Sequence, residues 1–430
     1  MKACRSSFTK AISVFMAAIL TLGALALSGC SKSDAPEKIV IWAFDYYIDA
    51  AKEAVKLYQD KYPDAQFEIV EFGHEDMVEK FKIALAAGNK ENLPDVIIEE
   101  YYNLKGYLEF YGDYFADLTE YVDPSLYVDF TMESVKYDGK VWGVPYDTGV
   151  GAWFYREDIL SEAGFADADL QDITWDRFIE IGKVVKEKTG KYMIPIWPEC
   201  NIEGRVMLQS AGSWYYDEDG NLDIADNKAI VDMTVTLKEL LTSGVACEVT
   251  SWDDILASFY NGNAAGIVGG GWWSFLIREE ESQSGLWRVT TPPRMTGSDS
   301  YTNYSNCAGC CWIVLNKDTK QTATDFVMDT FAISDEIADT MARIKTVVPA
   351  LKSGKDTASA KAGDPYFGNQ NLVEIMAEWS LSVPYVNYGR HPYEIAYFHG
   401  SLIPDFRRGK TSIDDVISAL QLEAEKIDNQ

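Results

Sequence analysis

The first part of the chain alternates short apolar runs with amphipathic segments. Residues 38–44 form a nearly continuous apolar run and residues 66–72 alternate, so both predict strands. Residues 49–62, and about 76 to 87, carry apolar positions at helical spacing. Residues 95–98 predict a third buried strand. The order β-α-β-α-β is typical of a mostly parallel sheet with helices on its faces.

In sheets of this kind, ligands bind beyond the carboxyl ends of the strands. The predicted strands therefore direct attention to the loops that start at Trp42 and Glu99. Aromatic and acidic side chains are concentrated there to a degree that is unusual for mere connections: Trp42, Phe44, Asp45, Glu99, Glu100, Tyr101 and Tyr102.

A second compact unit begins near Asp147. Asp138-Gly139 predicts a tight turn, and residues 141–145 predict the return strand of a hairpin. A run of aromatic and small residues after Asp147 predicts a buried strand, in which Phe154 and Tyr155 are core residues. A helix over residues 157–163 follows, and Gly164 ends it.

The second unit continues with two helices that have good N-caps, Thr174 before residues 175–188 and Ser251 before a helix that ends at about 260. A small-residue strand over residues 264–268 leads to three glycines and then to Trp272-Trp273. No Lys-Ser/Thr pair follows the glycines, which argues against a phosphate loop. We expect the glycines to bring the backbone close to a ligand. One indole would stack on the ligand and the other would pack inward, in an order that the sequence leaves open.

A family resemblance rests on the stretch around Asp147. Val-Pro-Tyr-Asp-Thr-Gly, followed by Trp-Phe-Tyr-Arg-x-Asp-Ile-Leu-x-x-Ala-Gly, resembles the family 1 extracellular solute-binding proteins of bacterial ABC importers. Most of that family serves sugar uptake. The similarity continues, in the order of the family, through residues 174–178, 212–223, 269–273 and 349–350.

The resemblance implies an α/β, two-lobed, periplasmic-binding-protein-like fold of type II, with discontinuous lobes joined by a hinge. It implies that residues 38–146 plus 307–348 form lobe 1 and residues 147–306 plus 349–430 form lobe 2. On this interpretation a strand at 312–315 and a helix at 322–332 return to the first lobe. The helices between about 372 and 427 then belong to the second lobe.

The amino terminus has the layout of a secretory signal. Positive charges at Lys2, Arg5 and Lys10 precede an uncharged apolar run over residues 11–27. Leu27-Ser28-Gly29-Cys30 resembles a bacterial lipoprotein processing site. The resemblance implies a signal peptide over 1–29, a lipid on Cys30, a tether over 30–37, and attachment to the outer side of the cell membrane. An uncleaved membrane helix is the alternative, because the apolar run approaches the length of a span.

Charge and cysteines narrow the possible partners. The net charge of −29 becomes −32 without residues 1–29, which carry three positive charges and no negative ones. Such a surface repels nucleic acid and anionic lipid. Five cysteines remain besides Cys4 and Cys30, an odd number that implies no complete disulfide framework. Cys307 and Cys310 form a C-x-x-C, but no nearby His or second pair completes a zinc site, so we expect small buried residues there and neither metal nor cofactor.

A sugar needs aromatic rings for its apolar face and polar groups for its hydroxyls. The chain has an aromatic content of 13%, although most aromatic residues in any protein are core residues. Our candidate ligand contacts, each weighed against a core or turn role, are Trp42, Phe44, Asp45, Glu100, Tyr101, Asp147, Trp214, Trp272, Trp273 and Tyr385. Trp197 and Trp379 lie in loops that the sequence does not place.

The resemblance implies a monomeric, non-enzymatic protein that captures an oligosaccharide by hinge closure and delivers it to the permease. One alternative keeps the binding role but changes the ligand to a polyamine or a peptide. Another is a surface glycoside hydrolase, which needs two carboxylates at a fixed separation. With 67 acidic residues any number of such pairs can be proposed, so this signal carries no information. The sequence contains no nucleophile elbow, zinc-binding His motif or dinucleotide fingerprint.

Overall fold

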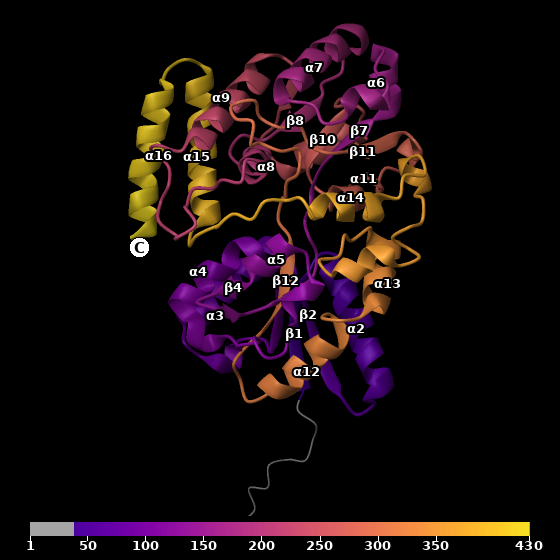
Figure 1. Ribbon diagram of the computed structural model, residues 1–430, viewed down its shortest axis with the longest axis vertical. Helices are drawn as coiled ribbons and strands as arrows, with labels where there is room; N and C mark the ends of the chain where they lie inside the picture. Colours follow the sequence, from indigo (N-terminus) through magenta and orange to yellow (C-terminus); the bar gives the residue numbers. More distant parts are fainter. Residues whose placement is uncertain (1–37, 430) are drawn as a thin grey trace, which may run out of the picture.

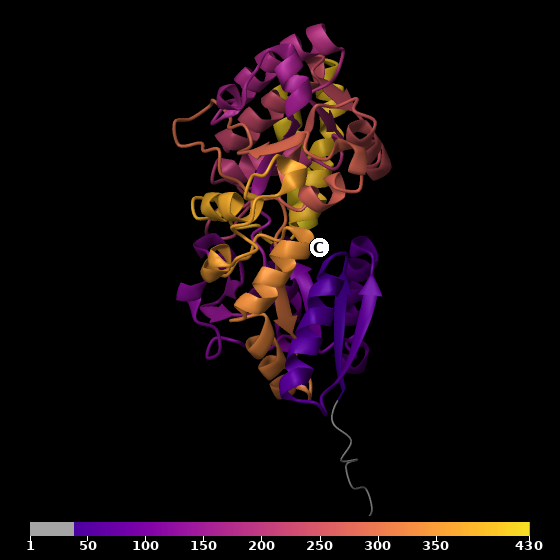
Figure 2. The same cartoon turned by 90° about the vertical axis from the view of Figure 1, so that its right-hand side faces the viewer.

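The computed structural model describes residues 38–429, so the signal peptide, Cys30 and the tether lie outside the described residues. Two lobes are stacked along the long axis of the molecule (Figure 1). The view turned by 90° shows the same two lobes joined by a narrower middle (Figure 2). The α/β class and the two-lobed architecture predicted from the sequence are confirmed.

One five-stranded sheet organises the first lobe, in the order β2-β1-β3-β12-β6. β1 (Lys38–Phe44) lies parallel to both β2 (Gln66–Phe72) and β3 (Val96–Glu100). β12 (Cys310–Val314) is antiparallel to β3 and to β6 (Val144–Pro145). The predicted β-α-β-α-β order is therefore correct, and its parallel part is extended by two antiparallel strands.

Four helices pack against this sheet because each presents an apolar face to it: α2 (Tyr47–Lys61), α3 (His74–Ala86), α4 (Tyr101–Tyr111) and α12 (Lys320–Thr330). Two more lie outside them, α5 (Asp129–Ser134) against α4 and α13 (Asp335–Lys345) against α2. The return of the chain after Cys307 to the first sheet, expected from the family resemblance, is seen in β12 and α12. Cys307, Cys310 and Cys311 are buried where β12 begins, and the cysteines of the described residues are free.

A three-stranded antiparallel sheet, β10-β7-β11, forms the centre of the second lobe. Its strands are β7 (Gly151–Arg156), β10 (Gly266–Gly270) and β11 (Trp287–Thr290), and a parallel pair lies beside it, β8 (Ile194–Ile196) and β9 (Ala246–Glu248). Phe154 and Tyr155 are buried in β7, as predicted. The helices of this lobe are α6 (Glu157–Ala163), α7 (Trp175–Thr189), α8 (Ile202–Ser210), α9 (Lys228–Thr242), α10 (Trp252–Tyr260), α11 (Trp273–Ile277), α14 (Leu372–Ser380), α15 (Pro392–Arg407) and α16 (Ile413–Asp428).

The predicted helix ends are confirmed where the capping chemistry is strong. Thr174 accepts a hydrogen bond from the Arg177 amide at the start of α7, and Ser251 accepts one from the Asp254 amide at the start of α10. Gly164 ends α6 in the left-handed conformation, with φ of 94°.

The hairpin prediction is only partly correct. Asp138 and Gly139, with φ of 51° and 71°, form the tight turn between β4 (Lys136–Tyr137) and β5 (Lys140–Val141). The return strand ends at Val141, however. Residues 144 and 145 pair with β12 in the main sheet instead, because their buried side chains gain more from that core than from a small exposed hairpin.

Three segments connect the lobes side by side. Asp147 forms an isolated bridge with Pro349, and Val150 forms one with Asn306. The Thr148 amide donates to the Val348 carbonyl at 3.0 Å, and the Cys307 amide donates to the Gly149 carbonyl at 2.8 Å. The crossings are therefore bonded to one another and form one hinge region.

Candidate ligand-binding cleft

The loop after β1 is tied to the first crossing through Asp147. Asp45 follows the strand with φ of 45°, and α2 begins two residues later. The hydroxyls of Tyr46 and Tyr47 both donate to Asp147 Oδ2, at 2.8 and 2.7 Å. On the other oxygen, Asp147 Oδ1 accepts the Cys310 amide at 3.0 Å. This carboxylate therefore joins the strand end of the first lobe to two crossings.

Asp147 is almost fully buried, and this environment shifts the pKa of its carboxyl group. Burial raises the pKa of Asp147 to about 6, against the opposing effect of the hydrogen bonds from Tyr47, Tyr46 and the Cys310 amide. The Tyr101 hydroxyl donates to the Asp147 carbonyl oxygen at 2.8 Å. A small pocket opens here between the crossings, lined by Tyr46, Asp147, Gly149, Val150, Gly271, Trp272, Lys345, Thr346, Val347 and Val348.

A buried charge pair lies at the end of β3. Glu100 Oε2 is 3.5 Å from Nε2 of His74, the first residue of α3, and it also accepts a hydrogen bond from the Tyr393 hydroxyl of the second lobe. Burial favours the neutral carboxyl, but His74 outweighs it and lowers the pKa of Glu100. Burial likewise disfavours the imidazolium, yet the Glu100 carboxylate raises the pKa of His74 to about 9. Both groups are therefore charged at neutral pH.

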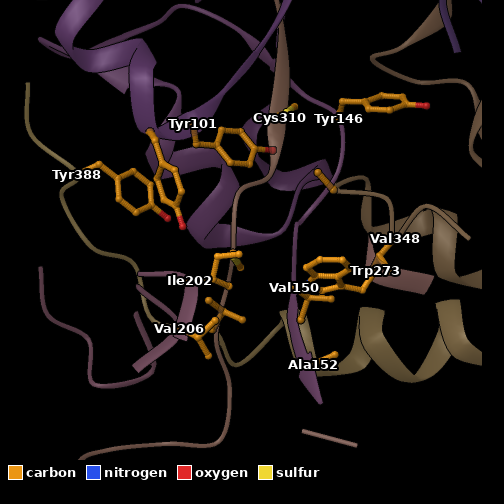
Figure 3. Packing of buried hydrophobic residues seen from close by; sticks show 14 of the residues in the cluster. Tyr101, Tyr146, Val150, Ala152, Ile202, Val206, Trp273, Cys310, Val348 and Tyr388 are labelled. Carbon is orange, nitrogen blue, oxygen red and sulfur yellow. The ribbon is translucent and has the colours of Figure 1, made fainter. Parts of the chain in front are cut away.

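Aromatic rings from the two lobes meet beside this pair. Tyr102 of α4 stacks on Trp214 with ring centroids 5.5 Å apart and an interplanar angle of 24°. Tyr388 meets Tyr102 edge-on at 4.5 Å and Trp214 at 5.2 Å. Figure 3 labels Tyr101 and Tyr388 at this boundary together with Ile202 and Val206 of α8. The lobes thus lie closed on one another through flat aromatic surfaces.

The structure separates the two adjacent indoles. Trp273 is fully buried and Trp252 stacks on it at 4.9 Å, so Trp273 is the residue that packs inward. Trp272 is half-buried, lines the hinge pocket and donates from Nε1 to the Cys307 carbonyl at 2.9 Å. Gly269 and Gly270 belong to β10 rather than to a loop. A Cβ on them would lie 2.3 and 2.2 Å from the Nε1 atoms of Trp273 and Trp272, so these glycines make room for the indoles.

Four residues expected in loops lie in strands: Trp42 and Phe44 in β1, Glu99 and Glu100 in β3. β1 ends at Phe44, as its apolar run predicted, so the loop after it begins three residues later than Trp42, and β3 runs two residues further than expected. Trp42 is 5% exposed in β1 and packs on Phe72 at 5.1 Å, so its placement in a loop was wrong. Glu100 is the last residue of β3, yet it still reaches the lobe boundary. Phe44 packs on the His74 ring at 4.7 Å. Tyr385 remains exposed, and Trp197 and Trp379 are half-buried.

Sequence reasoning missed several residues that the fold brings to the boundary: Tyr46, Tyr47, His74, Arg205, Tyr388 and Tyr393. Tyr46 and Tyr47 directly follow Asp45 in a loop that was predicted, so the signal for them was present. His74 opens a helix after β2, at the same sheet edge. The other three come from helical or irregular segments of the second lobe, for which no local pattern indicated a position.

Two further properties of the described residues bear on function. Within residues 38–429, no cluster of three or more His, Cys, Asp or Glu side chains has the arrangement needed to hold a metal ion. No helix in that same part of the chain combines the length and apolar character that a membrane span requires.

Comparison with known sequences gives a family and curated relatives. The model of the bacterial extracellular solute-binding protein family matches residues 53–365. A lactose-binding protein of Rhizobium radiobacter is 33% identical over 95% of this chain and 96% of its own length. A maltodextrin-binding protein of Bacillus subtilis is 23% identical over 96% of this chain and 97% of its own length.

Solved structures share the fold. A binding protein associated with an ABC transporter of B. animalis subsp. lactis, in complex with β-1,6-galactobiose, superimposes with a TM-score of 0.74 at 21% identity, covering 92% of this chain and 98% of that one. The sugar-binding protein MalE of Xanthomonas citri gives a TM-score of 0.74 at 18% identity over 91% and 97%. With the family model covering most of the described residues, the chain belongs to the bacterial extracellular solute-binding proteins.

Proposed function

We propose that this chain captures an extracellular carbohydrate, in the form of an oligosaccharide, between its two lobes and presents it to the permease of an ABC importer. The observation that carries the proposal is the set of aromatic faces that meet across the boundary, with Tyr102 from one lobe and Trp214 and Tyr388 from the other. When the lobes part, these rings become flat apolar platforms for sugar rings. The names of the curated relatives support the same class of ligand.

Around these platforms lie the polar groups that a sugar needs. Glu100 and His74 form a charged pair at the cleft, and Asp45 lies at its rim. They can exchange hydrogen bonds with hydroxyls once closure excludes water. We assign residues 38–146 plus 307–348 to the first lobe and 147–306 plus 349–430 to the second. Closure is a rotation about the three bonded crossings.

The finer parts of the proposal concern location and partners. We propose that the mature protein is a monomer anchored by lipid on Cys30 at the outer side of the membrane, and that it leaves its ligand chemically intact. Polyamine or peptide ligands remain the alternative within the same fold. Mass spectrometry of the mature amino terminus tests the lipid directly.

The test of function is thermal unfolding of residues 31–430 against mono- and oligosaccharides, amino acids and polyamines, with Trp fluorescence and analysis of the recovered sugar. A sugar at about 100 times its dissociation constant adds about 2.7 kcal/mol of stability. Trp214→Ala should abolish that gain. Tyr62→Ala removes an exposed aromatic residue that contacts Asp329 within the first lobe, and it should retain the gain. Stabilisation by polyamines alone, or degradation of the sugar, would refute the proposal.

A further inference from the structure

Arg205 is a buried cation at the boundary between the lobes. It lies on α8 of the second lobe and is 5% exposed. Its guanidinium carbon is 5.0 Å from the ring centroid of Tyr393 and 5.7 Å from that of Tyr102. Because Tyr393 belongs to the second lobe and Tyr102 to the first, the guanidinium occupies the place where the two lobes close.

Within the described residues, this guanidinium forms no ion pair at contact distance. Its Nε makes no hydrogen bond, and no carboxylate of residues 38–429 lies within the 4.0 Å of an ion pair. Glu100 is held by His74 and Tyr393, and its carboxylate attracts Arg205 only from beyond ion-pair distance. Glu203 lies two positions earlier on α8, but burial raises its pKa to about 8, against the opposing charge of Arg205. Glu203 is therefore mostly protonated at neutral pH and supplies little negative charge.

An unpaired buried cation is costly. The attraction between the guanidinium and the two tyrosine rings offsets part of the desolvation free energy, but it is weaker than an ion pair with an anion. Arginine is also a donor-only group with a planar fork of N–H bonds, which matches the geometry of a carboxylate. The site therefore has the donors and the charge for an acidic group that the chain itself does not provide.

We propose that Arg205 binds a carboxylate of the ligand, and that the ligand is an acidic oligosaccharide containing a hexuronate residue. This inference rests on the proposed carbohydrate function and narrows its substrate class. A carboxylate is favoured over a phosphate because the site offers one cation without a contact partner, which pairs with a monoanion better than with a dianion. His74 adds no further charge, since Glu100 already balances it.

The acidic exterior does not oppose this assignment. Without residues 1–29 the net charge is −32, but charges more than about 8 Å from the cleft are largely screened there at physiological ionic strength. Contacts inside a closed cleft are screened much less. Opening of the lobes moves Tyr102 away from Arg205, which exposes the guanidinium to an incoming carboxylate, and closure then buries the pair.

Isothermal titration calorimetry of the wild-type protein tests the ligand class. The acidic probes are trigalacturonate and a glucuronate-bearing xylo-oligosaccharide, their methyl esters keep the size but remove the charge, and lactose and maltotriose are neutral probes. We expect an acidic probe to bind on the order of 100-fold more tightly than its ester. Binding of neutral sugars with none of the acidic ones, or equal affinity for acid and ester, overturns this inference and leaves the carbohydrate function standing. If no carbohydrate binds, the proposed function fails as well.

Variants assign the effect to the residue. Arg205→Gln should remove the preference for acid over ester, and Arg205→Lys, which keeps the charge but not the fork, should retain part of it. Arg177→Gln is the matched control, because Arg177 is an exposed residue of α7 paired with Glu180. Equal weakening of acid and ester by Arg205→Gln would make Arg205 a general hydroxyl donor and overturn the inference. The comparison of acid with ester on the wild-type protein stands even where a variant does not fold.

Discussion

At the scale of single residues, the Asp147 carboxylate stabilises the fold by holding the loop after β1 and the start of β12 to the first crossing. Asp147→Ala leaves the Tyr47 hydroxyl and the Cys310 amide without their acceptor, and it leaves the Tyr46 hydroxyl only the Tyr47 hydroxyl, 2.8 Å away. We expect a loss of about 2–3 kcal/mol in the free energy of unfolding, measured by urea denaturation. Asp147→Asn keeps one acceptor oxygen and should lose less. Unchanged stability combined with lost ligand binding would instead make Asp147 a ligand contact.

His399 predicts a sensitivity to acid. The ring is fully buried, with Nδ1 3.1 Å from the Tyr215 hydroxyl and Nε2 2.9 Å from the Thr234 hydroxyl. Thr234 donates its own proton to the Ile230 carbonyl, so Nε2 donates to Thr234 and Nδ1 accepts from Tyr215. Both ring nitrogens are thus used by the neutral imidazole.

Burial lowers the pKa of His399 from 6.5 to about 3. The unfolded chain therefore takes up the proton first, and the stabilisation that is present above pH 6.5 is lost as the pH falls. Between pH 7 and pH 5 the wild type should lose about 2 kcal/mol relative to His399→Gln, in denaturant titrations at both pH values. A difference between the two proteins that does not change with pH would contradict this account.

The sequence predicted the positions of those cleft residues that lie at the end of a predicted strand or in a predicted crossing. Glu100, Tyr101 and Asp147 were expected at strand ends or crossings and lie at the boundary. Trp42 was misplaced because the loop was taken to begin inside the apolar run 38–44, whereas β1 continues to Phe44 and buries the indole. Arg205 was missed because its importance depends on having no partner, and that is a property of the folded environment rather than of the residue type.

At the scale of elements, the first two crossings pack backbone against backbone. Gly149 has φ of 51°, and a Cβ on it would lie 1.9 Å from the Ala308 carbonyl oxygen. Gly149→Ala should therefore combine backbone strain with a clash inside the hinge, and we expect a loss of more than about 2 kcal/mol by thermal unfolding. Gly139 also has a positive φ, 71°, but no atom lies within 4 Å of a Cβ built on it. The loss of stability in Gly139→Ala therefore measures the backbone strain without a clash. Equal losses for the two variants would show that the crossings can separate freely.

Residues at the start of α15 hold the two lobes together across the cleft through two polar contacts. Tyr393 bonds Glu100, and Arg390, just before the helix, pairs with Glu109 of α4 at 2.8 Å. Tyr393→Phe removes the hydrogen bond but keeps the ring, so we expect a larger radius of gyration for the ligand-free protein in X-ray scattering. Lys82→Ala breaks an exposed pair with Glu394 and should change little. An unchanged radius for Tyr393→Phe would mean that other contacts hold the lobes closed.

Elements were easiest to predict where periodicity and caps agree, as in α6, α7 and α10. The joining of residues 144 and 145 to β12 was not predictable, because their partners lie more than 160 positions away in the chain. The later crossings came from the family resemblance for the same reason. Pairing between distant segments is decided by the whole core, and local sequence carries little of that information.

At the scale of the whole molecule, the bonded crossings predict how a ligand acts on the protein. Hydrogen bonds join Thr148 to Val348 and Cys307 to Gly149, so the lobes share a common hinge and rotate about it as units. A ligand that contacts both lobes favours only the closed state. Saturation with a bound sugar should therefore raise the unfolding midpoint and, in Tyr393→Phe, lower the enlarged radius of gyration to that of the wild type. Both changes should disappear when Trp214→Ala is added to Tyr393→Phe. A sugar that raises the midpoint of Tyr393→Phe without lowering its radius would place its site within one lobe and would contradict capture by closure.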